Sequence, residues 1–345
     1  GVAKGAMLLH RNLIANVLQS EAWNAPIMQQ VPAGVQPVGI CALPLYHIFA
    51  FTCSMMLSLR TGAKVVLIPN PRDLPAVLKE LSQHKFHSFP AVNTLFNGLA
   101  HHPDFGTVDW SHLKISVGGG TAVQAAVAKL WKDKTGCPIC EGYGLSETSP
   151  SASCNPTTAT EYTGTIGVPL PGTWFKLIDD DGNEVPTGQP GEIAIKGPQV
   201  MAGYWQRPDE TAKSMTPDGY FKSGDIGIMD ERGFTKIVDR KKDMILVSGF
   251  NVYPNEIEDV VGQLDGVLEA ACVGMPDDKT GEAVKLVVVK KNPALTEADV
   301  RAYCKKNLTG YKQPKVVEFR TELPKTPVGK VLRRELRNNA AAAAV

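Results

Sequence analysis

The sequence lacks the features of several specialised protein classes. It contains no run of about 18 consecutive apolar residues, so we predict no transmembrane helix. Lysine plus arginine (36) nearly balance aspartate plus glutamate (35), and no long basic run occurs, so we expect no nucleic-acid partner. No internal repeat is evident. The start, Gly1 to Gly5, has neither a charged nor an apolar signal segment, and it lacks an initiator methionine. We therefore expect a processed or truncated piece without a signal peptide.

Cysteine is sparse and irregularly spaced. Seven cysteines, an odd number, are typical of reduced thiols in a cytosolic protein. Cys137 and Cys140 have redox-motif spacing, but no second pair completes a zinc site. Their apolar surroundings favour a buried strand over a redox site.

The first 160 residues alternate strand and helix patterns. A chain of 345 residues exceeds the roughly 250–300 residues of a single core, so we expect at least two domains. Such alternation predicts an α/β fold with a helix-covered, mainly parallel sheet, which binds ligands beyond the carboxyl ends of its strands. The expected strands are 38–45, 64–68, 88–92, 113–117 and one ending near Glu141, and the expected helices are 74–81 after Asp73, 94–101 and 123–131.

Two further regions follow. Residues 161–239 show short strands and turns, which predict a small β-rich subdomain that completes a large domain over 1–239. The polar run Asp239 to Asp243 marks the boundary to a small α+β domain over 240–338, and 339–345 is a low-complexity tail. The expected strands are 175–179, 191–196, 234–238, 268–274, 283–290 and 315–319, with helices at 254–264 and after a capping box at Thr296 to Asp299.

Four segments are candidates for a functional site. Gly142 to Thr148 joins glycines, which let a ligand approach the backbone, to an aromatic ring and to oxygens suited to Mg²⁺. Asp218 to Asp225 alone indicates a turn, although a carboxylate after glycine can also bind a ribose diol. Asp239 to Glu256 begins with five charges typical of a solvated linker, and Pro324 to Lys330 resembles an ordinary surface turn.

Together, and in this order, the four segments resemble the adenylate-forming superfamily of acyl-CoA synthetases, luciferases and peptide-synthetase adenylation domains. The resemblance covers essentially the whole chain. It is strongest to bacterial long-chain fatty acyl-CoA synthetases, because Asp218 to Lys242 resembles their fatty-acid signature. Tyr220, Phe221 and Ser223 depart from that signature conservatively.

The resemblance implies a two-step reaction. A fatty acid and ATP give acyl-adenylate and pyrophosphate, and coenzyme A then displaces AMP. The implied cofactor is Mg²⁺, held by Glu147, with ATP and coenzyme A as co-substrates. Lys330 is the implied catalytic cation, which suits a mobile point charge on a flexible stem. The implied nucleotide-binding residues are Lys4, Gly118, Gly119, Gly120, Glu141, Gly142, Tyr143, Gly144, Ser146, Asp225 and Arg240.

The remaining implied roles concern movement and channels. Lys242 matches a hinge about which a mobile C-terminal domain rotates between the two steps. Gly249 and Phe250 match the coenzyme A channel. His47, more often structural on spacing alone, matches a catalytic or gating position. Phe49 and Phe51 then become candidates for the acyl pocket.

The phosphate loop of this family is represented only by Gly1 to Gly5, with Ala3 in place of a common proline. We therefore expect the chain alone to be a poor enzyme. A medium-chain or aryl acyl-CoA synthetase, or an incomplete fragment, stays open as an alternative. A dinucleotide oxidoreductase is disfavoured, because the glycine run at 118–120 lacks the GxGxxG form. Expected localisation is cytoplasmic, and the sequence leaves open a peripheral membrane contact and a homodimer.

Overall fold

The computed structural model describes residues 4–326 and 329–341, and side chains as far as Arg337. The chain divides into two compact units. The first contains Gly1–Ser223 and Gly227–Ile237, and the second contains Gly224–Ile226 and Val238–Val345. The sequence predicts a domain boundary between residues 239 and 240, whereas the chain passes from the first unit to the second between Ile237 and Val238, after an earlier crossing at Gly224–Ile226.

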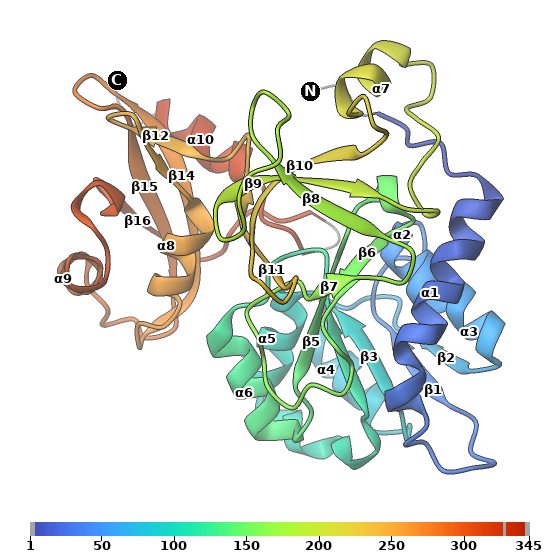
Figure 1. Cartoon of the computed structure of the whole chain (residues 1–345). Helices are drawn as coiled ribbons and strands as arrows, with labels where there is room; N and C mark the ends of the chain where they lie inside the picture. The colour runs from blue at the N-terminus through green and yellow to red at the C-terminus, as the bar shows by residue number, and fades with distance from the viewer. Residues whose placement is uncertain (1–3, 327–328, 342–345) are drawn as a thin grey trace. The chain divides into compact units, whose positions relative to one another are not determined.

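The first unit is built on a seven-stranded sheet (Figure 1). Its first five strands are all parallel, as expected, and the sixth pairs antiparallel with both the fifth and the seventh. The strand expected over 38–45 ends at Cys41, before Pro44, and the one expected over 113–117 begins only at Ile115. In sheet order the strands are β2 (Lys64–Leu67), β1 (Val38–Cys41), β3 (Ser88–Ala91), β4 (Ile115–Gly118), β5 (Ile139–Gly144), β6 (Ser151–Cys154) and β7 (Val168–Pro169).

Helices cover both faces of this sheet. Trp131 of α6 (Ala125–Thr135) donates its Nε1–H to Ser116 Oγ at 2.9 Å, whereas Ile27 of α1 (His10–Met28) packs in one cluster with Ile115. Neighbouring strand residues point to opposite faces, so α1 and α6 lie on opposite sides. The other helices here are α2 (Ile48–Ala50), a π-helical turn (Phe51–Met56), α3 (Leu57–Thr61), α4 (Leu74–Leu81) and α5 (Asn93–His101).

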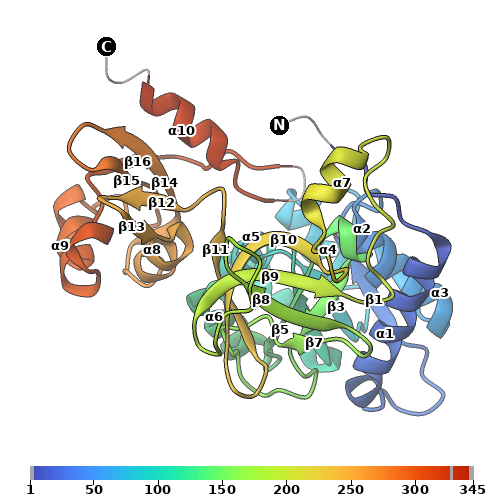
Figure 2. The ribbon, with the colours of Figure 1, turned by 45° about the horizontal axis from the view of Figure 1, so that its top comes forward.

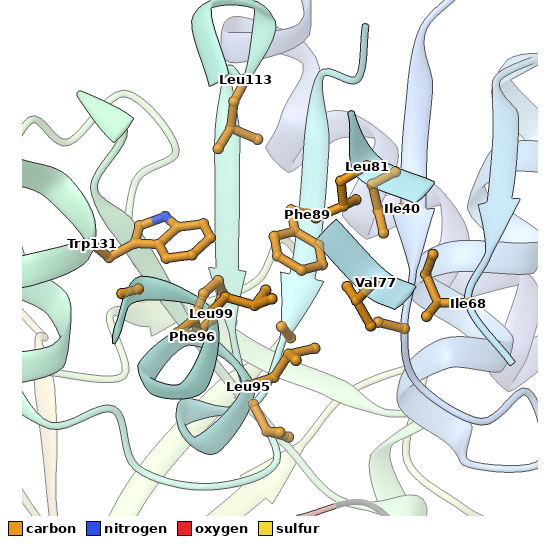
Figure 3. Packing of buried hydrophobic residues seen from close by; sticks show 14 of the residues in the cluster. Ile40, Ile68, Val77, Leu81, Phe89, Leu95, Phe96, Leu99, Leu113 and Trp131 are labelled. Atoms are coloured by element: carbon orange, nitrogen blue, oxygen red, sulfur yellow. The ribbon is translucent and has the colours of Figure 1, made fainter. Parts of the chain in front are cut away.

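The main core lies between the sheet and α4, α5 and α6. Figure 3 shows the Phe89 ring between Trp131 on one side and Leu81 and Ile40 on the other. The Phe89 and Trp131 ring centroids lie 5.8 Å apart. Asp73 accepts a hydrogen bond from Ala76 N at 3.1 Å, which confirms the expected cap of α4. This packing makes the sheet a rigid support for the turns at its strand ends.

A four-stranded sheet follows, as the β-rich pattern predicted. The Ser223-Gly224-Asp225 stretch was expected to be a turn, and that prediction is wrong. These residues lie inside a nine-residue strand, β10, because their neighbours pair on both sides. The order is β11 (Thr235–Arg240), β10 (Phe221–Met229), β9 (Pro190–Lys196) and β8 (Trp174–Ile178), and helix α7 is Pro208–Ser214.

The second unit has an α+β fold, in which helices lie on both faces of a five-stranded sheet (Figure 2). Leu286 and Val288 share a cluster with residues of α8 and α9, whereas Val287 packs with Leu336 of α10. Thr296 and Asp299 form the expected capping box, and α10 continues to residue 341, inside the expected tail. The elements are β12 (Ile245–Val247), β13 (Phe250–Val252), α8 (Pro254–Val261), β14 (Val267–Asp277), β15 (Gly281–Lys290), α9 (Glu297–Asn307), β16 (Val316–Arg320) and α10 (Arg333–Ala341).

Candidate active site

Three consecutive glycines, Gly118 to Gly120, form the turn at the carboxyl end of β4. Gly118 is the last residue of the strand, and a Cβ on Gly119 would lie 3.0 Å from the Phe49 ring. Gly120 has a φ of +77°, a conformation that side chains other than glycine rarely adopt. The turn therefore presents bare backbone where parallel sheets bind their ligands.

The end of β5 lies next to this turn, because β4 and β5 pair. Gly142, Tyr143 and Gly144 continue the strand and pair with β6. A Cβ on Gly144 would lie 1.8 Å from the Pro150 carbonyl oxygen, so only glycine fits there. Tyr143 is half-buried and stands edge-on to Phe175, with the ring centroids 6.4 Å apart.

Glu141 has a structural partner. Its Oε1 accepts a hydrogen bond from Val123 N at 3.0 Å, and the side chain is buried. The backbone oxygen of Glu141 accepts from Asn155 N at 3.0 Å. The carboxylate therefore fixes the chain just before α6, and a direct role in nucleotide binding stays a prediction.

Ser146 and Glu147 lie on a 3-10 turn, Ser146–Thr148, directly after β5. Ser146 is exposed, and Glu147 is half-buried. Glu147 Oε1 accepts a hydrogen bond from the Tyr204 hydroxyl at 2.7 Å. Within residues 4–326 and 329–337, no three His, Cys, Asp or Glu side chains gather as a metal cage. One carboxylate beside hydroxyl oxygens nevertheless suits Mg²⁺, which is usually bound through one or two carboxylates plus substrate phosphates.

Lys4 lies beside residues that were not predicted. Its Nζ is 3.1 Å from Glu210 Oε2 and 4.4 Å from the centroid of the Tyr204 ring. Tyr204 is therefore in contact with both Lys4 and Glu147. The only sequence signal for Tyr204 is a tyrosine after a glycine near the start of α7, and that pattern is too common to have singled it out.

His47 precedes α2 and accepts a hydrogen bond from Phe49 N through Nδ1 at 3.3 Å. This bond makes His47 the N-cap of the helix, as the spacing alone indicated. Phe49 is buried in the main core beside Gly119, and Phe51 opens the π-helical turn. Such π turns are frequent at functional sites. The gating role of His47 and the acyl-pocket roles of both phenylalanines stay predictions.

The second unit brings Asp225, Arg240 and Lys330 together. Arg240 Nε lies 3.3 Å from Asp225 Oδ1, and Asp225 is almost fully buried. Burial lowers the pKa of Lys330 to about 8, the nearby charge of Arg240 adds to this effect, and Asp225 opposes it. The Lys330 N–H donates to Thr326 Oγ1 at 3.1 Å, which closes the turn that carries the lysine. The predicted motif also includes residues 327 and 328, which lie outside the described residues.

Lys242, Gly249 and Phe250 lie on turns of the same unit. Lys242 is exposed in the turn between β11 and β12. Ser248 and Gly249, with φ values of 50° and 83°, form the tight turn between β12 and β13. Phe250 is exposed and stacks on Tyr311, with centroids 4.9 Å apart. Each residue is accessible, and its proposed role is untested.

The predicted site residues thus fall into two groups, one in each unit. The first unit holds the glycine turns with Tyr143, Glu147 and Lys4, and the second holds Asp225, Arg240 and Lys330. Gly1 to Ala3, the rest of the predicted phosphate loop, lie outside the described residues. Glycine turns at strand ends and a buried carboxylate paired with arginine are typical of a nucleotide-binding α/β protein.

Comparison with known proteins gives the family. The AMP-binding enzyme family matches residues 1–205, and the AMP-binding enzyme C-terminal domain matches residues 256–330. The chain therefore belongs to the AMP-binding enzyme family, as the resemblance implied.

Three relatives define the likeness further. The long-chain-fatty-acid–CoA ligase of Escherichia coli O6:H1 is 55% identical over 99% of this chain, which spans 60% of that protein. The enzyme of that name from Bacillus subtilis (strain 168) is 39% identical over 97% of this chain, which spans 59% of that protein. The crystal structure of ATP-bound MatB from Rhodopseudomonas palustris matches with a TM-score of 0.90 and 33% sequence identity, and the match covers 100% of this chain and 67% of that one. The chain thus spans about 60% of the length of these curated relatives.

Proposed function

We propose that this chain is part of a ligase that activates a long-chain fatty acid with ATP and transfers it to coenzyme A. The products are acyl-CoA, AMP and pyrophosphate. The observation that carries the proposal is the cluster of Asp225, Arg240 and Lys330, because it joins a buried carboxylate for the ribose hydroxyls to a cation for the reacting anions. The 55% identity to a long-chain-fatty-acid–CoA ligase supports the substrate class.

In the proposed first step, a carboxylate oxygen of the fatty acid attacks the α-phosphorus, and the bond to pyrophosphate breaks. Both reactants are anions, so catalysis depends on neutralising charge and aligning the groups. Lys330 is assigned to the carboxylate and the α-phosphate. Bound Mg²⁺ would neutralise phosphate charge, and Glu147 is the residue that would hold it, with Ser146 contacting phosphate.

In the proposed second step, the thiol sulfur of coenzyme A attacks the acyl carbon, the bond to AMP breaks, and the thiol proton is released. We assign Gly249 and Phe250 to the thiol channel and Lys242 to the hinge. An exposed turn between two strands suits a hinge, since such residues absorb backbone rotation with little loss of packing.

Two further properties are proposed. Cytoplasmic placement is supported by seven cysteines that all remain free thiols. A peripheral contact with lipid would give access to an acid that partitions into membranes. None of the described helices is long and apolar enough to cross a bilayer. Flotation with vesicles, with and without the fatty acid, tests that contact, and recovery only in the unbound fraction contradicts it.

The function is tested with two proteins: the chain 1–345, and a chimera in which these residues replace the matching region of the Escherichia coli relative. We expect palmitoyl-CoA formation by the chimera and little or none by the chain alone. Octanoate and benzoate serve as competing acids. A chimera that prefers benzoate contradicts the proposed substrate class.

A further inference from the structure

One short segment of the first unit connects the backbone around Lys4 to the turn that carries Glu147. Met7 N–H donates to the Gly203 oxygen at 2.8 Å, and Trp205 N–H donates to the Gly5 oxygen at 2.7 Å. Met201 N–H donates to the Glu147 oxygen at 2.8 Å. Residues 201–205 therefore pair with both segments, although these lie about 140 positions apart in the sequence.

The side chain of Tyr204 makes a second connection between the same two segments. It is buried, with 6% of its surface exposed. Its hydroxyl donates to Glu147 Oε1 at 2.7 Å, and the Lys4 ammonium lies 4.4 Å from its ring centroid. Ring faces attract cations, and hydroxyls bind carboxylates strongly. A tyrosine hydroxyl is protonated at neutral pH, so it acts as the donor to Glu147.

The two charges do not neutralise each other. The Lys4 ammonium pairs with Glu210 at 3.1 Å. Glu147 has no ion-pair partner among the described residues, so its negative charge stays available. Tyr204 thus holds a cation and a carboxylate near one another without a direct pair between them.

We propose that Tyr204 is a positioning residue that fixes Lys4 and Glu147 relative to each other, so that a metal–polyphosphate ligand meets both charges already in place. Glu210 completes the arrangement by holding the Lys4 ammonium against the ring. This inference rests on the proposed function, because Lys4 and Glu147 are assigned there to phosphate and metal.

If Tyr204 had a purely structural role, removing its hydroxyl alone would leave the Mn²⁺ affinity unchanged. Tyr204 packs with Met201 and Phe221, so its ring also contributes to a small core. Tyr204→Phe keeps that packing and removes only the hydroxyl. Glu210→Gln removes the ion pair of Lys4, together with the longer pairs of Glu210 to Arg207 and Lys213 at 3.4 and 3.5 Å. Tyr204→Leu removes both contacts of the tyrosine. Tyr220→Phe is the matched control, since its ring also lies near a lysine ammonium, 4.5 Å from Lys176.

The first measurement is ligand binding to the chain 1–345. Electron paramagnetic resonance gives the Mn²⁺ affinity of the protein–ATP complex, with Mn²⁺ in place of Mg²⁺, and calorimetry in EDTA gives the affinity for metal-free ATP. Losing an outer-shell partner of a metal ligand costs about tenfold or more in metal affinity. Tyr204→Phe is expected to lower the Mn²⁺ affinity by that factor and to leave the affinity for metal-free ATP unchanged. Glu210→Gln is expected to lower the affinity for metal-free ATP and to leave the Mn²⁺ affinity unchanged. Unchanged Mn²⁺ affinity in Tyr204→Phe overturns the proposal.

The second measurement needs no ligand. The rate at which acetic anhydride labels Lys4, read by mass spectrometry, reports how firmly its ammonium is held. It should rise several-fold in Tyr204→Leu and Glu210→Gln, and stay the same in Tyr204→Phe and Tyr220→Phe. Equal labelling of Tyr204→Leu and the unaltered chain overturns the proposal. If the unaltered chain binds no ATP and no Mn²⁺, the same measurement on the chimera decides the assignment of Lys4 and Glu147, and labelling still decides whether Tyr204 holds Lys4.

Discussion

Arg333 Nη2 lies 2.7 Å from Glu258 Oε2 and joins the segment after Lys330 to helix α8. The same guanidinium lies 3.9 Å from Asp239 Oδ1 and 3.8 Å from Asp243 Oδ2. Asp239 and Asp243 flank Arg240 and Lys242 in the chain. One largely buried cation therefore ties the Lys330 segment to the segment that carries Arg240 and Lys242, the residues proposed for the ribose and the hinge.

Arg333→Met should strongly destabilise the second unit. Breaking a buried ion pair by removing one partner costs about 3–5 kcal/mol, because the other charge stays buried and unpaired. Thermal or urea unfolding of the chain 1–345 measures the loss. Arg333→Lys, which keeps a charge, should lose less. Equal stability of Arg333→Met and the unaltered chain at pH 7.5 contradicts the role of this pair.

The Arg333→Met loss should also depend on pH. Burial raises the pKa of Asp239 to about 6 although Arg333 opposes the rise, and burial also raises the pKa of Glu258. A carboxyl whose folded pKa is raised stabilises the fold at low pH, and that contribution is lost as pH rises through the folded value. The loss caused by Arg333→Met should therefore be smaller at pH 5 than at pH 8. Unfolding curves at the two pH values decide this, and a larger loss at pH 5 contradicts it.

The adenylation step should fall at alkaline pH. The role assigned to Lys330 needs its ammonium form, and the pKa of Lys330 is lowered to about 8 by burial and then by Arg240. Above pH 8 the adenylation rate of the chimera should drop about tenfold for each further pH unit, as for a single titrating group. Transfer from preformed acyl-adenylate should not follow this profile. Lys325→Met, which removes a lysine paired with Glu269 at 2.6 Å, is the control and should keep it.

Asp225→Ala should weaken nucleotide binding more than folding. Asp225 is the buried carboxylate assigned to the ribose hydroxyls, and hydrogen bonds to a charged group contribute about 1.5–3 kcal/mol. The KM for ATP of the chimera should rise about 10- to 100-fold, and far-UV circular dichroism should stay unchanged. An unchanged KM for ATP would remove Asp225 from the site.

Gly144→Ala should disrupt the β5–β6 pairing that carries the predicted adenine and metal residues. The added Cβ would lie 1.8 Å from the Pro150 oxygen, a backbone atom that cannot move alone. Forcing atoms into a packed site costs about 1–3 kcal/mol and occasionally more. Gly106→Ala is the control, because nothing lies within 4 Å of its Cβ. Equal melting temperatures of the two variants contradict this account.

The sequence predicted the parallel sheet well, but it gave no indication of α1. The reason is that α1 turns polar side chains inward. Asn12, Asn16 and Gln19 are buried and donate at 2.7 Å to the backbone oxygens of Pro198, Ser151 and Pro171, while Ile14 and Leu18 are exposed. Apolar periodicity identifies a helix by an apolar inner face, and the inner face of α1 is largely polar, with Val17 and Ile27 as its buried apolar residues.

The candidate site was predictable only where local motifs carry it. Glu147, Asp225, Arg240 and Lys330 each lie in a recognisable short pattern. Tyr204 and Arg333 act through contacts with residues 57 and 75 positions away, Glu147 and Glu258. Such long-range partners depend on how strands and turns come together, which one sequence read locally does not contain.

Palmitate-dependent exchange of pyrophosphate into ATP measures acyl-adenylate formation alone, the step that we propose these residues catalyse. We predict exchange by the chimera that requires palmitate, is lost in Lys330→Ala and is retained in Lys325→Met. A folded chimera that shows no exchange with palmitate, or exchange unaffected by Lys330→Ala, would contradict the account.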